Sequence, residues 1–170
     1  MAHKRLRSWG LNTIANSSDS AIFMQRKTPY VDRFEVKGPA LSGSDGWWWP
    51  FRDPFAKEFR EDIVKNLKER KEQLNDPWCI GFFVDNELHW GGPEDLAKCV
   101  LASPANMQAK IEFSKDLKKK YAGDIKKLND AWKTSYSSWD DFLAKTEVPK
   151  GADKQDLRDF TKKITEEYFK

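Results

Sequence analysis

The chain has 170 residues, of which 39% are hydrophobic and 34% charged, a composition typical of a globular domain with a sizeable core. Its 30 Lys and Arg residues against 27 Asp and Glu residues give a net charge of +3, too small to indicate a nucleic-acid partner. No stretch approaches the roughly 20 apolar residues that span a membrane. Two cysteines and two histidines give no metal-ligand spacing and no cofactor motif, so we expect neither metal nor cofactor.

The first half of the chain alternates between short strands and a helix. A β-branched run predicts a strand over 11–16, and a weaker strand, interrupted by charged residues, is predicted over 30–36. A helix over 53–73 begins with an Asp cap followed by Pro and carries an apolar residue at every fourth position. A turn then leads to a strand over 78–84.

The second half predicts helices. One begins near Ser103, a shorter one covers 124–132, a capping box stands at 138–141, and a last helix runs from Asp153 to the final residue. This order of elements indicates an α/β fold with parallel strands. Three strands are few for a closed domain, so we expect residues 1–170 to be part of a larger one.

The strand over 78–84 is the most informative segment, because its continuous apolar run ends in Asp85, Asn86 and Glu87. Such a run predicts a strand buried on both faces, as in parallel sheets. Active sites of parallel barrels are built at the carboxyl ends of their strands. The alternative is an exposed acidic turn, which the Gly-rich loop and the tryptophans nearby in the sequence make less favoured.

Eight tryptophans are more than a core of this size needs, and Trp47, Trp48 and Trp49 stand in a Gly/Ser/Pro-rich loop. An indole offers a flat amphipathic surface that suits the apolar face and polar rim of a sugar ring. We expect at least one of the three to stack on a sugar, the alternative being that they cover the edge of the core.

Glycoside hydrolysis uses two carboxyl groups across the bond that breaks, and the general acid of the pair needs apolar surroundings that favour its protonated form. Glu87 fits this role because aromatic and aliphatic residues precede and follow it. Asn86 could bind a sugar hydroxyl, while Asp85 is better placed to orient its neighbours. Trp90 is equally compatible with substrate binding and with packing, and His89 is a weaker candidate ligand.

These residues and three further stretches resemble clan A glycoside hydrolases, in particular family 42 β-galactosidases and agarase-like proteins. An Asn-Glu pair ends the fourth barrel strand in that clan, and Asn86–Glu87 matches it. The stretch Trp9–Asn16 resembles the second strand, and Pro50–Phe55 resembles the entry to the third helix. The most specific match covers Tyr121–Trp132 and Thr134–Trp139, which is similar to a stretch after the fourth strand.

The resemblance implies an incomplete (β/α)8 TIM barrel, running roughly from the second strand through the helix before the fifth. It implies a retaining mechanism on β-galactosides or an agar-like polysaccharide, with Glu87 as acid/base and Asn86 on the 2-hydroxyl. Trp48, Trp49, Trp90, Asn16 and His89 are then the expected substrate contacts. Ser17 departs from agarase-like relatives, which often have Trp there.

The second Glu of such an enzyme, the nucleophile at the end of the seventh strand, has no counterpart here, so we expect the isolated chain to be inactive. A periplasmic or secreted parent protein would suit the substrate, although no secretory signal is visible. The alternative function is a non-catalytic carbohydrate-binding module, which needs no nucleophile. A single-strand nucleic-acid binder is disfavoured by the near-neutral charge.

Overall fold

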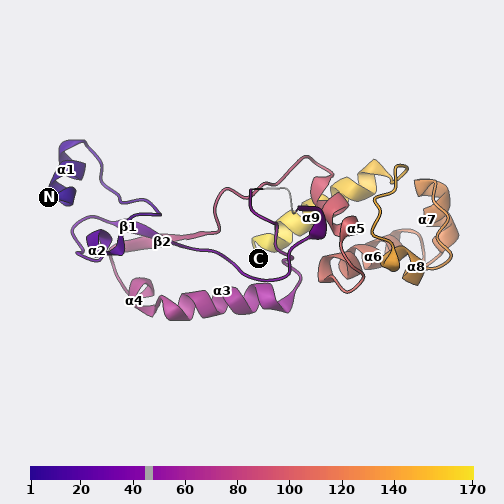
Figure 1. Ribbon diagram of the computed structural model, residues 1–170, viewed down its shortest axis with the longest axis horizontal. Coiled ribbons are helices and arrows are strands. Elements are labelled where there is room, and N and C mark those ends of the chain that lie inside the picture. The colour runs from indigo at the N-terminus through magenta and orange to yellow at the C-terminus, as the bar shows by residue number, and fades with distance from the viewer. Residues whose placement is uncertain (45–47) are drawn as a thin grey trace. The chain divides into compact units, whose positions relative to one another are not determined.

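The computed structural model describes residues 1–44 and 48–170 (Figure 1). The elements in this part of the chain are α1 (Ala2–Ser8), α2 (Ser20–Phe23), β1 (Tyr30–Phe34), the 3-10 turn η1 (Ser42–Ser44), α3 (Lys57–Glu69), α4 (Lys71–Leu74), β2 (Cys79–Val84), α5 (Asp95–Ala102), α6 (Gln108–Lys120), α7 (Ile125–Trp132), α8 (Trp139–Ala144) and α9 (Lys154–Tyr168). None of these helices is long and apolar enough to cross a membrane.

The chain forms two compact units. The first contains residues 1–36 and 61–86, and the second contains 37–60 and 87–170. The chain therefore passes from one unit to the other three times, the last time directly after Asn86.

The sheet of the first unit consists of β1 and β2, which pair in parallel from Tyr30 beside Cys79 to Phe34 beside Val84. Both predicted strands and the parallel arrangement are therefore confirmed. The strand predicted over 11–16 is wrong in its extent, because only Ile14 forms a bridge, beside Tyr30. Ile14 is the one buried side chain of that run, so the core fixes this position alone.

The prediction that β2 is buried on both faces is wrong for this chain. Ile80 is 61% exposed and Phe83 is 52% exposed. Within the described residues β2 has β1 as its sheet partner, so one of its edges and much of its apolar surface face solvent.

A small core supports this sheet, built from Ile14, Phe23 and Tyr30, with the last two rings stacked at 4.5 Å between centroids. The Tyr30 hydroxyl donates to the buried carboxylate of Asp76 at 3.1 Å, and Arg26 donates to the same oxygen at 2.9 Å. The Trp78 amide, followed by Arg26, lowers the pKa of Asp76. The turn predicted before β2 therefore also binds the core residue Tyr30 through Asp76.

The predicted cap at Asp53 belongs to a different helix. Asp53 is fully buried, and one carboxylate oxygen accepts from the Phe55 amide at 2.9 Å in a turn that precedes α3. The other oxygen accepts from the Ala109 amide at 2.8 Å, in the first turn of α6. Burial raises the pKa of Asp53, while backbone amides, Ala109 first among them, oppose the rise. The helix predicted over 53–73 therefore begins late, at Lys57, and it breaks into α3 and α4 after Glu69.

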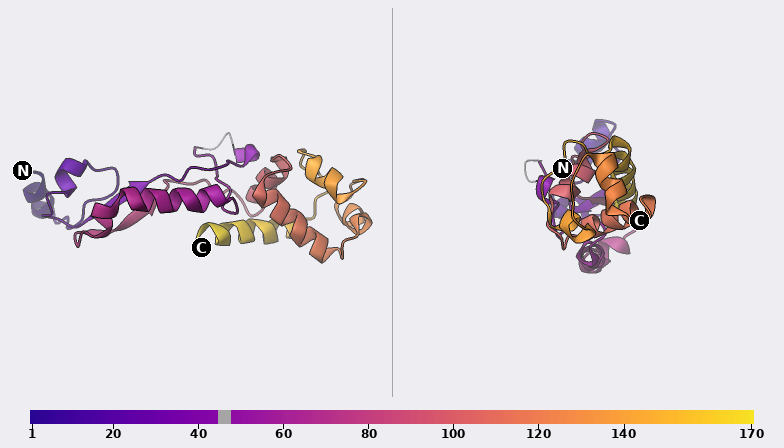
Figure 2. Two further views of the ribbon diagram at one scale, coloured as in Figure 1. Left: turned by 90° about the horizontal axis from the view of Figure 1, so that it is seen from below. Right: turned by 90° about the vertical axis from the view of Figure 1, so that its right-hand side faces the viewer.

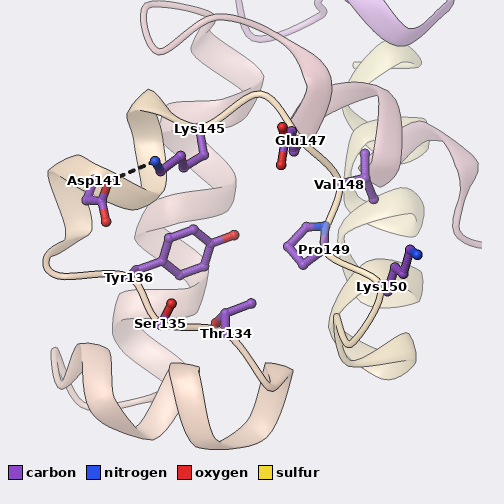
Figure 3. A pocket seen from close by; sticks show the side chains of 9 residues that line it. All are labelled: Thr134, Ser135, Tyr136, Asp141, Lys145, Glu147, Val148, Pro149 and Lys150. Carbon is purple, nitrogen blue, oxygen red and sulfur yellow. Dashed lines mark ion pairs between the residues drawn. The ribbon is translucent and has the colours of Figure 1, made fainter.

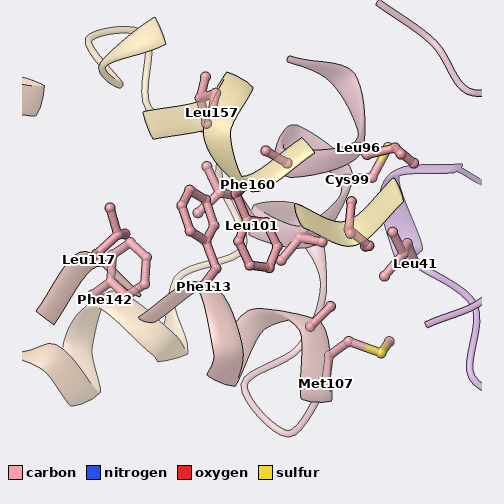
Figure 4. Packing of buried hydrophobic residues seen from close by; sticks show 14 of the residues in the cluster. Leu41, Leu96, Cys99, Leu101, Met107, Phe113, Leu117, Phe142, Leu157 and Phe160 are labelled. Atoms are coloured by element: carbon pink, nitrogen blue, oxygen red, sulfur yellow. The ribbon is translucent and has the colours of Figure 1, made fainter. Parts of the chain in front are cut away.

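In the second unit, α9 packs against α5 and α6; the left view of Figure 2 shows α9 as the yellow helix that ends at the C-terminus. Figure 4 shows the buried side chains between these helices, among which the rings of Phe113 and Phe160 stack at 4.3 Å between centroids. The predicted helices at α7, α8 and α9 are confirmed, with side-chain caps from Asp124, Ser138 and Asp153. Helix α5 was not predicted.

The helix predicted from Ser103 begins instead at Gln108, because Ser103 ends α5. Its hydroxyl donates to the Cys99 carbonyl at 2.9 Å and accepts from the Ser42 amide at 3.1 Å. The residue therefore serves the turn between the two helices and not the start of the second.

Lys110 on α6 is fully buried, an unusual position for a lysine. Its ammonium group donates to the carbonyl oxygens of Leu101 at 2.9 Å, Ser103 at 2.7 Å and Lys145 at 2.5 Å. Burial lowers the pKa of Lys110 to about 8. One cation thus satisfies three carbonyls from the end of α5 and the residue after α8.

We expect Lys110→Met to lower the free energy of unfolding by about 3 kcal/mol, because buried carbonyls lose their donor. The folded chain releases the Lys110 proton above its pKa of about 8, whereas the unfolded chain holds it to about pH 10.4. The stability of the wild type should therefore rise relative to Lys110→Met between these values. Urea unfolding across pH 7–10.5 measures both effects; Lys119→Met, at an exposed position of α6, is the control. Equal free energies of unfolding for Lys110→Met and Lys119→Met would contradict the role of Lys110.

We also expect the full chain to self-associate through β2, because an unpaired, apolar strand edge is a template for another chain. Replacing Ile80 and Phe83 by Lys should suppress the association, since charge on an edge strand opposes edge pairing. Sedimentation velocity over a concentration series measures this. Val64→Lys on α3, where the wild-type side chain is 49% exposed, is the matched control and should leave the association unchanged.

Candidate active site

The carboxyl ends of β1 and β2 are joined by Asp85. Its amide donates to the Phe34 carbonyl at 2.8 Å, and its buried carboxylate accepts from the Val36 amide at 2.7 Å. These bonds continue the link between the two chains beyond the last strand pair, Phe34 beside Val84. Asp85 therefore orients the segment that follows β2, as the sequence predicted.

Asn86 lies between two residues with left-handed backbone conformation, since φ is 60° at Asp85 and 48° at Glu87. Residues other than glycine adopt this conformation at a cost of about 1–2 kcal/mol, and such residues are enriched at functional sites. Two of them around Asn86 bend the chain sharply where β2 ends. Asn86 is half-buried, and the Glu87 side chain is exposed.

The exposure of Glu87 differs from the prediction of apolar surroundings. Phe82, which precedes it in β2, is half-buried, and Leu88 after it turns into the core of the second unit. Leu88 and Trp90 therefore pack in the second unit, whereas Phe83 and Val84 are 52% and 40% exposed, and the Glu87 side chain itself remains exposed. Residues close to Glu87 in the sequence therefore do not bury its carboxyl group.

Trp90 packs within the second unit. Its ring meets Phe51 edge-on at 5.4 Å and Tyr168 at 5.3 Å between centroids, and it stacks on Phe169 at 5.5 Å. Of the two interpretations left open for Trp90, packing is therefore the one for which the structure provides partners.

The other predicted tryptophans differ in exposure. Trp48 is 77% exposed, as a stacking platform requires, whereas Trp49 is half-buried. The indole nitrogen of Trp49 is buried and has no hydrogen-bond partner within 1–44 and 48–170. Trp47 lies outside the described residues.

Asn16 and His89 are the remaining predicted contacts. Ile14 bridges to Tyr30, the first residue of β1, and Asn16, which is half-buried, follows Ile14 by two residues in the parallel direction. His89 is exposed, and its charge lowers the pKa of Asp95 as the last and smallest of several causes, the Gly92 amide being the first.

Among the hollows of the described residues, one of about 320 Å³ lies in the first unit and one of about 450 Å³ lies in the second. Neither is lined by Asn86 or Glu87. No group of three or more His, Cys, Asp or Glu that could hold a metal ion occurs among the residues searched, 1–44 and 48–170. The hollow of the second unit was not predicted from the sequence. One of its walls belongs to the stretch Thr134–Trp139, which forms part of the most specific match identified in the sequence.

Comparisons with known proteins relate the chain to glycoside hydrolases that degrade agar. No protein-family model matches it. Beta-agarase A and beta-agarase B of Vibrio sp. (strain JT0107) are 32% and 33% identical to it over 160 and 149 residues, in each case covering 81% of this chain. The chain spans 16% of the length of each of these relatives.

Two solved structures agree. The agarase AgWH50C superposes with a TM-score of 0.81 at 26% identity, over 99% of this chain and 26% of its own. An exo-beta-agarase superposes with a TM-score of 0.80 at 26% identity, over 97% of this chain and 24% of its own. The agarase part of the predicted resemblance is confirmed, whereas the family 42 β-galactosidase part finds no support in these relatives.

We expect Asp85→Ala to lower the free energy of unfolding by about 1–2 kcal/mol, because it removes an acceptor at a left-handed position that Ala tolerates poorly. Asp85→Asn, which keeps an acceptor and tolerates this conformation, should be close to neutral. Hydrogen exchange of the Val36 amide measures the bond directly. Equal protection of that amide in Asp85→Ala and the wild type would contradict the role given to Asp85.

Proposed function

We propose that the chain is the acid/base-bearing portion of a retaining β-agarase-like glycoside hydrolase that acts on agar. The observation that carries the proposal is the position of Asn86–Glu87, directly after a strand of a parallel sheet, in a chain related to β-agarases over most of its length. In parallel barrels this is the end of the strand where catalytic groups stand.

The barrel interpretation is part of the proposal. Ile14, β1 and β2 lie side by side in sequence order, all parallel, and α3 lies between the two strands in the sequence. This is the order expected of the second, third and fourth strands of a (β/α)8 barrel. The exposed apolar surface of β2 supports it, because barrel strands are covered on both faces.

In the proposed reaction Glu87 donates its proton to the glycosidic oxygen as the bond from that oxygen to the sugar carbon breaks. A second carboxylate forms a covalent bond to the same carbon. Glu87 then accepts a proton from the water that displaces this carboxylate, and Asn86 holds the 2-hydroxyl throughout. The two carboxyl groups of such a pair are about 5–5.5 Å apart.

The second carboxylate is not provided by the glutamates that follow Glu87. Glu94 directly precedes α5 and Glu112 lies on α6, and both pair with lysines; Glu147 lies in a loop, and Glu166 and Glu167 lie on α9. Glu87 without the second carboxylate cannot give the covalent intermediate, so the isolated chain is proposed to be inactive. Trp48, with its exposed indole, is the proposed stacking surface for substrate; Trp49, Trp90, Asn16 and His89 are weaker contacts.

A non-catalytic carbohydrate-binding role is the second candidate, and the exposure of Trp48 favours it. The two candidates differ in what they require of Glu87. Binding through Trp48 needs no acid, whereas hydrolysis does.

A chimera tests the catalytic role. Residues 1–170 replace the aligned segment of beta-agarase A, and turnover of agarose oligosaccharides is measured with Glu87, Glu87→Gln and Glu87→Asp. Loss of the general acid/base should lower turnover by about 10²–10⁴-fold. With an activated aryl glycoside, whose leaving group needs no proton, added azide should restore turnover of Glu87→Gln, because azide attacks the covalent intermediate without a general base.

Glu166→Gln, at an exposed position of α9, is the matched control and should keep full turnover. Equal turnover of the Glu87 and Glu87→Gln chimeras would exclude the acid/base role. The 170-residue chain by itself should show no turnover, and activity that disappears in Glu87→Gln would contradict its proposed inactivity.

A further inference from the structure

The hollow of about 450 Å³ in the second unit has a volume in the range of small-molecule sites. Its walls are the connection between α7 and α8, the helix α8, and the segment that leads to α9 (Figure 3). The lining residues are Thr134, Ser135, Tyr136, Asp141, Lys145, Glu147, Val148, Pro149 and Lys150. None of them is among the predicted catalytic or substrate-binding residues.

Asn129 holds the first wall in place. Its side-chain oxygen accepts from the Tyr136 amide and the Thr134 hydroxyl, both at 2.9 Å, and its side-chain nitrogen donates to the Tyr136 carbonyl at 2.8 Å. Asn129 belongs to the most specific motif of the chain, and the proposed hydrolysis does not use it. A single amide side chain thus pre-orders the loop that carries Tyr136.

The second wall is equally constrained. The Asp141 carboxylate accepts from the Ser137 amide at 2.9 Å and from the Ser137 hydroxyl at 3.2 Å, and it lies 3.8 Å from the Lys145 ammonium. The Lys145 carbonyl is in turn held by buried Lys110. A pre-ordered site loses little entropy when it binds a ligand.

Several polar groups of the hollow have no partner among the described residues. They are the hydroxyls of Tyr136 and Ser135, the Glu147 carboxylate and the Lys150 ammonium. Burial, followed by the charge of Asp141, raises the pKa of Tyr136, so its hydroxyl remains a donor. Figure 3 shows the Tyr136 ring extending across the hollow toward Pro149.

The charges of the lining cancel, because Asp141 and Glu147 are balanced by Lys145 and Lys150. An anion or a cation would therefore meet like charge as well as opposite charge. The lining combines unpaired donors and acceptors with the apolar surfaces of Tyr136, Val148 and Pro149. A neutral polyhydroxylated ring matches both properties, since its hydroxyls donate and accept and its C–H face packs on an aromatic ring.

We propose that this hollow is a binding site for a neutral saccharide, held by Tyr136, Glu147 and Lys150. The expectation that an agar saccharide fills it rests on the proposed function. The site adds binding to a saccharide chain without taking part in bond cleavage.

NMR titration of the full 170-residue chain tests the site, with neoagarotetraose and maltotetraose as probes. Saturable shifts of the amides of 134–137, 147, 148, 150 and 151 with at least one probe, at a Kd of about 1 mM or tighter, are expected. Tyr136→Phe, which keeps the ring against Phe142, should weaken binding about five-fold, the effect of one neutral hydrogen bond. Replacing Glu147 and Lys150 by Ala should weaken it about ten-fold or more, because both groups are charged.

The control replaces Lys162 and Glu166 by Ala, which removes the same two charges from an exposed pair on α9 and should leave binding unchanged. Absence of shifts with both probes in a folded chain would overturn the proposal. Shifts that persist unchanged in the Glu147 and Lys150 double variant would also overturn it. Failure of the proposed catalysis is observed separately, as turnover in the Glu87 chimera, and does not affect this measurement.

Discussion

The parallel pairing of β1 and β2, closed at its carboxyl end by Asp85, is the constraint on which the candidate active site depends. The strand ladder sets the register, and the Asp85 carboxylate on the Val36 amide extends the pairing past the strands. Asn86 and Glu87 owe their place to this arrangement, because the chain bends there through two left-handed residues. Without the Asp85 bonds the bend would have no fixed position relative to β1.

The second unit depends on buried polar groups in a comparable way. Asp53 caps α6 from a segment 56 positions earlier in the chain. Asp156 on α9 accepts from the Tyr121 hydroxyl at 2.7 Å and from the Trp132 indole at 2.8 Å, and it pairs with Lys120. These bonds give the helices a defined arrangement that apolar packing leaves less specific, since apolar contacts are not directional. The motif Tyr121–Trp132 therefore orders these helices through Tyr121 and Trp132, and it orders the wall of the hollow through Asn129.

The proposed catalysis and the proposed saccharide site require different things of this chain. Hydrolysis requires a second carboxylate near Glu87 and an enclosure that an exposed side chain does not have. The hollow requires only groups that the second unit already holds in place through Asn129, Asp141 and Lys110. The proposed saccharide site is thus independent of the proposed catalysis.

Features that depend on neighbours along the chain were predictable from the amino-acid sequence. The caps at Asp124, Ser138 and Asp153 were predictable because a cap bonds amides two or three residues away. The strand β2 and the polar residues that end it were predictable from one apolar run. The resemblance to agarase-like proteins also came from local motifs.

Contacts between groups that are distant in the sequence depend instead on the folded arrangement. Asp53 has the local pattern of a cap, yet its second oxygen serves α6 because burial brings that helix to it. Periodicity predicted a buried β2, but burial depends on which elements cover the strand, and Ile80 and Phe83 are exposed. The packing of Trp90, the burial of Lys110 and the hollow beside Tyr136 likewise arise from contacts between residues far apart in sequence, for which a single sequence carries no local signal.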